Sequence, residues 1–237
     1  MPIVILDPGH GGNDSGAQGN GLIEKHLSLD IAKRTRDWLL MQYEADIRLT
    51  RETDIFVPLS ERAQMANRLG ADYFVSFHHN AAGGQGFESF VFTGTRNQAS
   101  GQLQDIIHDR IMQFLGPLGI RDRGKKTANF AVLRETAMPA ILLENLFVDQ
   151  SAETNWLKNE SFRSQLANAI SKGIGSALNL RERFPAGTPD WKREAVEWLF
   201  QEGLLTNEDW KSTVENPLPL WAEAVVLRRL YDKLNRP

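Results

Sequence analysis

The sequence contains no cysteine, which excludes disulfide bonds and every zinc site built on thiolates. It has only five histidines, so any metal ion must be held by imidazoles together with carboxylates. No apolar run approaches the ~20 residues of a membrane span, and no basic-then-apolar segment marks a signal peptide. The net charge of -3 argues against general binding to nucleic acid. We therefore expect a protein made in the cytoplasm, with no membrane or nucleic-acid partner, whose export would need another route.

What the chain does contain is typical of a globular protein: 237 residues, 41% hydrophobic and 24% charged. Short apolar runs typical of strands alternate with segments of helical periodicity, which predicts an α/β domain with a largely parallel sheet. The expected strands are residues 3–6, 45–51, 71–82, 86–92, 130–134 and 139–145. The expected helices of this domain are residues 22–40, 58–66, 98–115 and 161–180.

Polar and charged residues outside these patterns are assigned by default to the surface. The basic run 121–126 is expected to form a solvated loop, and His108 to lie on the exposed side of its helix. Arg51 and Arg62 are taken as surface charges, while Glu88 is left as either a site residue or a solvated carboxylate.

The first strand ends in the stretch Asp7-Pro8-Gly9-His10-Gly11-Gly12. Pro8 lacks an amide donor and Gly9 tolerates positive φ, so the strand stops there and His10 lies on a loop just beyond it. Ligands of open α/β sheets bind at this edge. Neither glycine-rich phosphate-binding pattern is present, so the glycines leave room for a substrate or a metal rather than a phosphate.

Two further strands end in the same way. Residues 71–82 run into His78 and His79, of which only one can reach a shared metal because neighbours in a strand point to opposite faces. Residues 139–145 end in Glu144, a carboxylate that is costly to bury unless it is paired or functional. Glu24 opens a helix, where it either complements the helix dipole or binds the metal. Two histidines, one glutamate and an open position match a catalytic zinc site, with a second glutamate left as proton acceptor.

With these residues in order, the sequence resembles the zinc-dependent N-acetylmuramoyl-L-alanine amidases over about residues 3–174. The likeness rests on six motifs, namely Leu6 to Gly12 with Asp14 and Gly16, Glu24-Lys25, Leu49 to Arg51, Leu59 with Arg62 and Ala66-Asn67, Ser76 to Ala81, and Leu142 to Glu144. His79 stands where the family usually has a small residue.

The resemblance implies a six-stranded, mostly parallel twisted sheet with helices on both faces, and one catalytic Zn²⁺. It implies that His10, Glu24 and His78 are the zinc ligands and that Glu144 is the catalytic glutamate. The activity implied is cleavage of the amide between N-acetylmuramic acid and L-alanine of peptidoglycan. Without a visible signal peptide the chain looks like a phage endolysin, which reaches the wall once the host membrane is permeabilised. Alternatives are a wall-binding protein that has lost turnover, or a zinc peptidase or deacetylase acting on another substrate.

Residues 1–180 are thus expected to form the catalytic domain, 181–188 a linker and 189–237 a small helical domain. This last stretch carries Trp191, Trp198, Trp210 and Trp221, four of the six tryptophans of the chain. They either stack on wall carbohydrate or form a core. A piece this small is marginal on its own, so packing on the catalytic domain or self-association is also open. The oligomeric state is left undecided.

Overall fold

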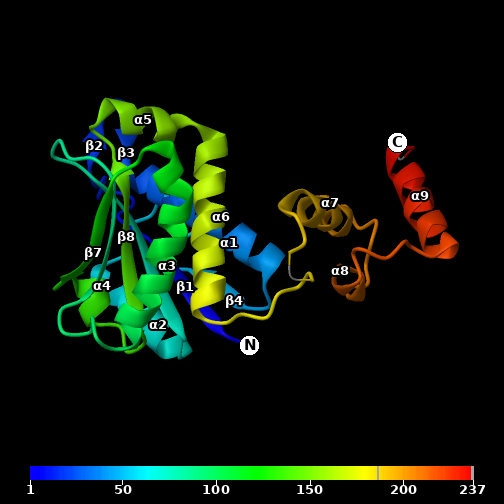
Figure 1. Cartoon of the computed structure of the whole chain (residues 1–237), viewed down its shortest axis with the longest axis horizontal. Coiled ribbons are helices and arrows are strands. Elements are labelled where there is room, and N and C mark those ends of the chain that lie inside the picture. The colour runs from blue at the N-terminus through cyan, green and yellow to red at the C-terminus, as the bar shows by residue number, and fades with distance from the viewer. Residues whose placement is uncertain (186, 236–237) are drawn as a thin grey trace. The chain divides into compact units, whose positions relative to one another are not determined.

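The computed structural model describes residues 1–185 and 187–235. Ala186, inside the expected linker, and Arg236 and Pro237, at the end of the expected helical domain, lie outside the described residues. The chain forms two compact units, one made of residues 1–40 and 45–180 and the other of residues 41–44 and 181–237. The sheet and most helices belong to the first unit (Figure 1).

The first unit is built on a six-stranded sheet with the order β4-β1-β5-β8-β6-β7. All neighbouring pairs are parallel except β6 and β8, which are antiparallel. This is the mostly parallel α/β sheet that the sequence predicts. The strands are β1 (Ile3–Pro8), β4 (Asp46–Leu49), β5 (Tyr73–Asn80), β6 (Phe87–Phe92), β7 (Asp122–Ala128) and β8 (Ala140–Phe147), and a small hairpin adds β2 (Gln18–Gly19) and β3 (Leu22–Ile23).

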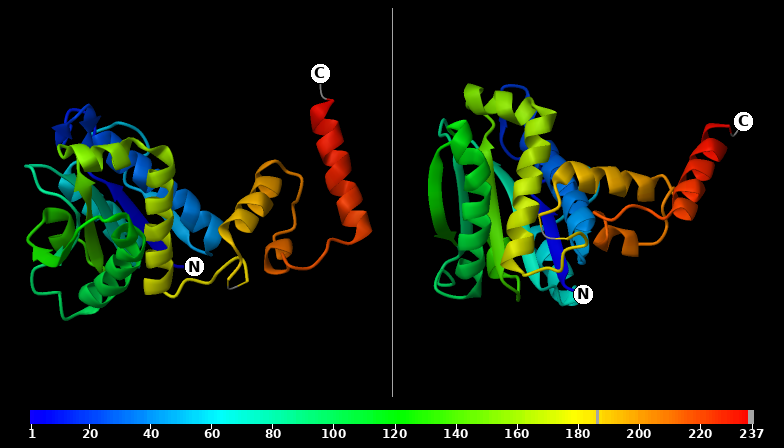
Figure 2. Two further views of the ribbon diagram at one scale, coloured as in Figure 1. Left: turned by 45° about the horizontal axis from the view of Figure 1, so that its top comes forward. Right: turned by 45° about the vertical axis from the view of Figure 1, so that its right-hand side comes forward.

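Helices cover both faces of this sheet (Figures 1 and 2). None of the described helices is long and apolar enough to cross a membrane. The helices of the first unit are α1 (Glu24–Gln42, whose last two residues belong to the second unit), α2 (Leu59–Leu69), α3 (Ala99–Leu115), the 3₁₀ turn η1 (Gly116–Leu118), α4 (Ala131–Arg134), α5 (Ser151–Lys158) and α6 (Glu160–Ala177).

The alternation of side chains along each strand divides the core into two layers. Ile5, Phe74 and Leu142 are buried against α2 and α4 in one layer. On the opposite face, Ser89 of β6 is bonded to Gln104 of α3, and α3 packs on α6. Even-numbered residues of β5 and β8 therefore face α2 and α4, which decides where His78 and Glu144 point.

The expectations for the run 121–126, for residues 130–134 and for His108 are wrong. The basic run 121–126 is largely strand β7, because its backbone pairs with β6 although its side chains are polar. Residues 131–134 form the helical turn α4, where a strand was expected. His108 is buried, with Nδ1 2.8 Å from the Ser89 hydroxyl and Nε2 3.0 Å from Asp122. For β7 and for His108, a partner far away in the sequence decides the outcome.

The second unit contains α7 (Asp190–Gln201), α8 (Asp209–Ser212) and α9 (Leu220–Leu234). Lys211 is buried there between Glu197 and Glu208, at 2.7 and 2.9 Å, and lies over the ring of Phe200. Arg193 pairs with Glu182 at 3.0 Å. Many large apolar side chains of this unit are nevertheless exposed.

Candidate metal centre

Three parallel neighbouring strands, β1, β5 and β8, end at one edge of the sheet. Pro8 lies opposite Phe77, so His10 follows β1 close to where His78 stands on β5. His78 in turn lies opposite Glu144 of β8. The sheet register thus places two histidines and a glutamate side by side.

Glu24, the first residue of α1, completes the group. Its Oε1 is 3.2 Å from Nε2 of His10 and 3.0 Å from Nδ1 of His78, and one ligand atom of each residue lies within 4.8 Å of the others. The carboxylate is buried and is further held by the amides of His79 and Ala17, at 2.9 and 2.7 Å. The structure therefore brings His10, Glu24 and His78 together.

The cluster can form because the backbone of the His10 loop lies very close to the side chains of His10, Glu24 and His78. Gly16 has φ +63°, and a Cβ there would lie 2.6 Å from Oε2 of Glu24 and 2.7 Å from the His10 ring. At Gly9, a Cβ would collide with the ring of His78. His10 itself has φ 60°, a left-handed conformation that is strained for a residue with a side chain. The glycines of this loop are required by the packing of the two rings.

Charge also favours the cluster. Burial alone would lower the pKa of His10, but the hydrogen bonds and charges of Glu24 and Asp14 outweigh it and raise that pKa to about 8. Burial would raise the pKa of Glu24, and the two histidines instead hold it well below its usual range. Glu24 thus remains a carboxylate between two imidazole rings, and its charge stabilises a cation at this position, either a proton on His10 or a metal ion in its place.

The donor set fits a divalent metal ion such as zinc. Two imidazole nitrogens and one carboxylate oxygen are the protein ligands of many catalytic zinc sites. Asp14 lies 2.9 Å from Nδ1 of His10. When Nδ1 donates to this carboxylate, Nε2 of the neutral ring presents a lone pair to the centre. The identity of the ion and the roles of these residues stay predictions.

Glu144 lines the same cavity, of about 390 Å³, together with His10 and His78. Its Oε2 is buried and, in the described part of the chain, has no hydrogen-bond partner. Burial raises the pKa of Glu144 to about 7. The cavity wall is otherwise largely apolar, with Phe56, Val57, Leu59, Phe130 and Val132. An unpartnered carboxyl in such a cavity is suited to receive and return a proton.

Two arginines expected at the surface are buried behind the His10 loop instead. Arg62 donates to the carbonyl oxygens of Pro8 and His10, at 2.6 and 2.7 Å, and pairs with buried Asp7 at 2.8 Å. Arg51 donates to the carbonyls of Gly9 and Lys25, both at 2.8 Å. It therefore ties the His10 loop to the first turn of α1, which carries Glu24. The expectation for both arginines is wrong because a residue pattern does not show which backbone carbonyls a loop places beside a side chain.

His79 lies on the other face of the sheet and is fully buried, with Nδ1 2.5 Å from the carbonyl oxygen of Asn145. Burial lowers its pKa to about 4. Only His78 of the pair enters the cluster, as alternation along a strand predicts.

Glu88 is also buried, opposite Glu144 in the antiparallel pair of β6 and β8. It is bonded to Lys126, to Arg123 at 3.1 Å and to Asn80 at 2.8 Å. It is therefore a paired carboxylate beside the site, and not a solvated one.

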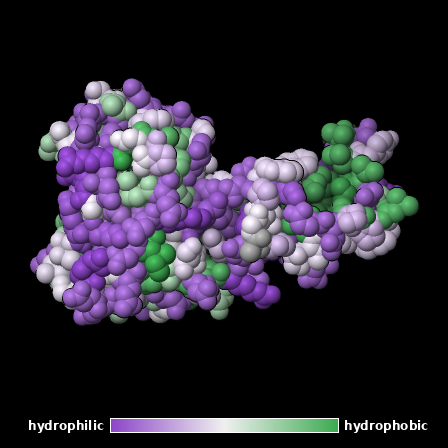
Figure 3. Space-filling view, in the orientation of Figure 1, coloured by the Kyte–Doolittle hydropathy of each residue, from purple (hydrophilic) through white to green (hydrophobic). Residues whose placement is uncertain are grey.

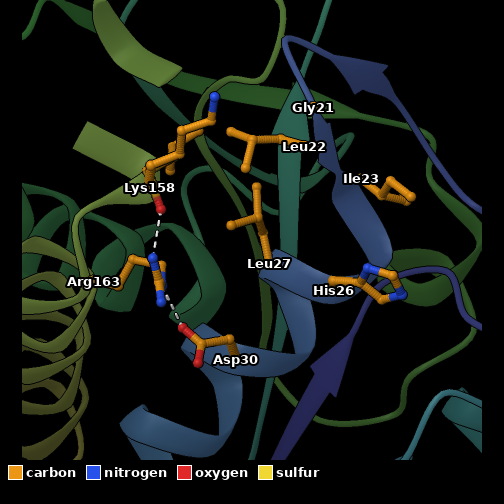
Figure 4. A pocket seen from close by; sticks show the side chains of 9 residues that line it. Gly21, Leu22, Ile23, His26, Leu27, Asp30, Lys158 and Arg163 are labelled. Carbon is orange, nitrogen blue, oxygen red and sulfur yellow. Dashed lines mark hydrogen bonds and ion pairs between the residues drawn. The ribbon is translucent and has the colours of Figure 1, made fainter. Parts of the chain in front are cut away.

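A second hollow of the same unit lies between the β2-β3 hairpin, α1 and the end of α5 (Figure 4). Two of its charged residues satisfy each other, because Arg163 is paired with Asp30 at 2.6 Å and also donates to the carbonyl of Leu157. His26 turns aside in this view and lies 3.5 Å from Asp54. This hollow has no convergent unpaired group comparable to Glu144.

Most of the chain is similar in sequence to known proteins. Residues 4–176 match the N-acetylmuramoyl-L-alanine amidase family. The chain is 44% identical over 189 residues to the endolysin of Bacillus phage SPP1, covering 79% of this chain and 70% of that protein. It is also 44% identical over 188 residues to the sporulation-specific N-acetylmuramoyl-L-alanine amidase of Bacillus subtilis, covering 79% of this chain and 72% of the other.

Solved structures agree with the sequence match. The crystal structure of N-acetylmuramoyl-L-alanine amidase from Clostridium difficile 630 is 34% identical with a TM-score of 0.71, covering 76% of this chain and 97% of that one. The catalytic domain of the amidase CwlV from Bacillus (Paenibacillus) polymyxa is 32% identical with a TM-score of 0.68, covering 76% and 100% of the two chains.

Proposed function

This chain belongs to the N-acetylmuramoyl-L-alanine amidase family and is a peptidoglycan hydrolase; we propose that it works with one Zn²⁺ held by His10, Glu24 and His78. The bond cleaved is the amide between N-acetylmuramic acid and the first alanine of the stem peptide. The observation that carries the proposal is the convergence of Nε2 of His10, Nδ1 of His78 and Oε1 of Glu24, with Glu144 in the same cavity.

When bound, the ion supplies Lewis acidity, which polarises the scissile carbonyl and lowers the pKa of water towards ~7. Glu144 accepts the proton of the attacking water and returns it to the leaving amide nitrogen. Its pKa of about 7 suits both transfers near neutral pH. Apolar side chains such as Val57 and Val132 line the cavity beside the reacting groups.

Three neighbouring residues hold the site in shape. Asp14 fixes which nitrogen of His10 faces the centre. Arg51 and Arg62 bind loop carbonyls and keep the strained loop at its place. These are positioning residues, because they act through His10 and Glu24.

Product analysis on purified cell wall tests the activity directly. An amidase releases new N-terminal alanine, whereas a glycosidase creates new reducing ends. The Glu144→Gln variant, purified in parallel, should bind the wall and zinc but release little alanine. New amino termini of another residue would favour the zinc peptidase alternative, and loss of acetyl groups a deacetylase. A wild-type protein that binds wall without any product would indicate the catalytically weak binder.

For the second unit we propose binding to wall carbohydrate. Trp191 and Trp221 are each 66% exposed and Trp198 is 50% exposed, and their rings offer flat apolar surfaces to sugars. A tethered binder raises the local concentration of an enzyme on its substrate without changing the chemistry. A fluorescent fusion of the full chain with Glu144→Gln should decorate susceptible Gram-positive cells. Failure of this fusion to bind, while it remains folded, would contradict the targeting role.

The biological setting that we propose is lysis at the end of a phage infection, with synthesis in the host cytoplasm and action on the wall after release. The likeness to a phage endolysin supports it. Expression inside a susceptible host should be harmless until the membrane is permeabilised. Lysis without permeabilisation would contradict this setting.

A further inference from the structure

The last helix of the chain, α9, has two different apolar faces. Its inner stripe packs within the second unit, with Ala222 buried and Val226 and Leu230 partly buried. Arg229 donates to the carbonyl of Leu204 at 2.9 Å, and Lys233 pairs with Glu202. These contacts fix the helix, and the opposite face remains bare.

The bare face has a regular pattern. Leu220, Leu227 and Leu234 recur every seven residues and are 82%, 64% and 76% exposed. Ala224 and Tyr231, both exposed, lie between them, so the five residues follow one another at alternating steps of four and three. This is the spacing of the a and d positions in a two-stranded coiled coil, with leucine at every d position. Green side chains gather over this helix in Figure 3.

We propose that this stripe (Leu220, Ala224, Leu227, Tyr231 and Leu234) pairs with the same stripe of a second copy of the chain. The two helices lie parallel about a two-fold axis. A self-complementary patch is what a two-fold interface requires, because each residue meets its own equivalent or a near neighbour. The inference goes beyond the proposed function and does not depend on it.

Two charges beside the stripe select the parallel arrangement. Glu223 and Arg228 flank the leucines on opposite sides, five positions apart, and neither has an ion pair within the described part of the chain. In a parallel pair these are g and e positions of successive heptads, so Glu223 of each copy meets Arg228 of the other. In an antiparallel pair centred on Leu227, the two Arg228 side chains would approach each other.

The expected dimer is weak. A helix of 15 residues is about 22 Å long, which gives a seam of two heptads and an interface at the small end of the range, below about 1,200 Å². The helix is already ordered by its inner stripe, so association does not carry the entropic cost of ordering it. The dimer should therefore form with rising protein concentration.

Sedimentation of the full chain across a hundredfold range of concentration tests the proposal. The mass should rise from one chain towards two. Leu227→Glu should remove the dimer while circular dichroism stays unchanged, because this side chain has no role in the inner packing. Glu223→Arg and Arg228→Glu should each weaken association about three- to tenfold, and the double variant should restore it. Asp232→Lys, a charge change on α9 outside the seam, is the matched control and should leave the dissociation constant unchanged.

Three results would overturn the proposal. One is a single-chain mass at the highest concentration, as expected if the stripe instead covers the chain's own catalytic unit or binds the wall. Another is a dimer that persists in Leu227→Glu but is lost in Trp198→Ser, which would place the interface on α7. A double charge variant that stays as weak as the single ones would refute the parallel register.

Discussion

The edge of the sheet around His10 and the C-terminal unit around α9 use their side chains in opposite ways. At the sheet edge, charged residues are buried and paired with one another, as Asp7 is with Arg62 at 2.8 Å. In the C-terminal unit, large apolar side chains such as Trp191 and Leu220 are exposed. A buried charge needs a partner inside the chain, whereas an exposed apolar patch gains one from outside. This difference agrees with our two proposals, chemistry at the first region and association at the second.

Removing a proposed metal ligand should have the largest effect on the sheet edge and none on the C-terminal unit. His78→Ala deletes one of the three converging donors. Metal affinity should therefore fall by much more than the about 10- to 100-fold that is lost when a hydrogen-bond partner of a ligand is removed. Wall hydrolysis should fall with it. Metal content per chain is the measurement, with His26→Ala, an exposed histidine outside the cluster, as control. His79→Ala should retain metal, and loss of metal there but not in His78→Ala would reverse our assignment.

Glu144→Gln should leave the metal in place and lower turnover about 100- to 10,000-fold, the usual value of general acid–base catalysis. The amide keeps the size of the side chain but cannot accept a proton. Initial rates of alanine release at matched zinc content measure the effect. Turnover near that of the wild type would remove Glu144 from the mechanism.

Asp14→Asn should weaken metal binding about 10- to 100-fold, because the neutral amide no longer fixes the His10 ring as a carboxylate does. Titration with a zinc indicator measures the affinity. Asp37→Asn, an exposed carboxylate elsewhere on α1, provides the control. Equal affinities in both variants would show that His10 is oriented by its loop alone.

Changes in the C-terminal unit should spare the chemistry. Trp191→Ser and Trp198→Ser should each weaken binding to purified wall about 2- to 10-fold, the value of one aromatic contact. Hydrolysis of soluble muropeptides and the thermal midpoint should not change, because both rings are largely exposed. A drop of several degrees in the midpoint would assign these tryptophans to a core.

The smallest expected effect concerns pH and stability. Burial lowers the pKa of His108, which lies between Ser89 and Asp122, whereas the unfolded chain titrates near its ordinary value of about 6.5. Below that pH the unfolded state binds a proton that the folded state excludes until its lower pKa is reached. The free energy of unfolding should therefore fall as pH falls below about 6.5. His108→Gln should reduce this dependence without abolishing it, because His79, whose pKa burial lowers to about 4, contributes in the same direction. An unchanged slope would show that His108 does not contribute.

The sheet was predictable because its central strands are continuous apolar runs, as Ile3–Leu6 and residues 140–143 are. The meeting of His10, His78 and Glu144 followed from the rule that parallel strands end at one edge. The interaction of Arg51 and Arg62 with loop carbonyls did not follow, because it depends on a loop conformation that no residue pattern encodes. Strand β7 was missed for a related reason. Lys125 and Lys126 are polar, and their strand lies at the edge of the sheet, where it pairs only with β6.

We propose that His10, Glu24 and His78 hold one catalytic zinc ion, and anomalous diffraction at the zinc edge can locate that ion in crystals of the wild-type chain supplied with zinc. We expect one strong peak about 2.0–2.2 Å from Nε2 of His10, Nδ1 of His78 and a carboxylate oxygen of Glu24, with an open side towards Glu144. A peak on other residues, such as His26 with Asp54, and none in this cluster would refute this zinc site.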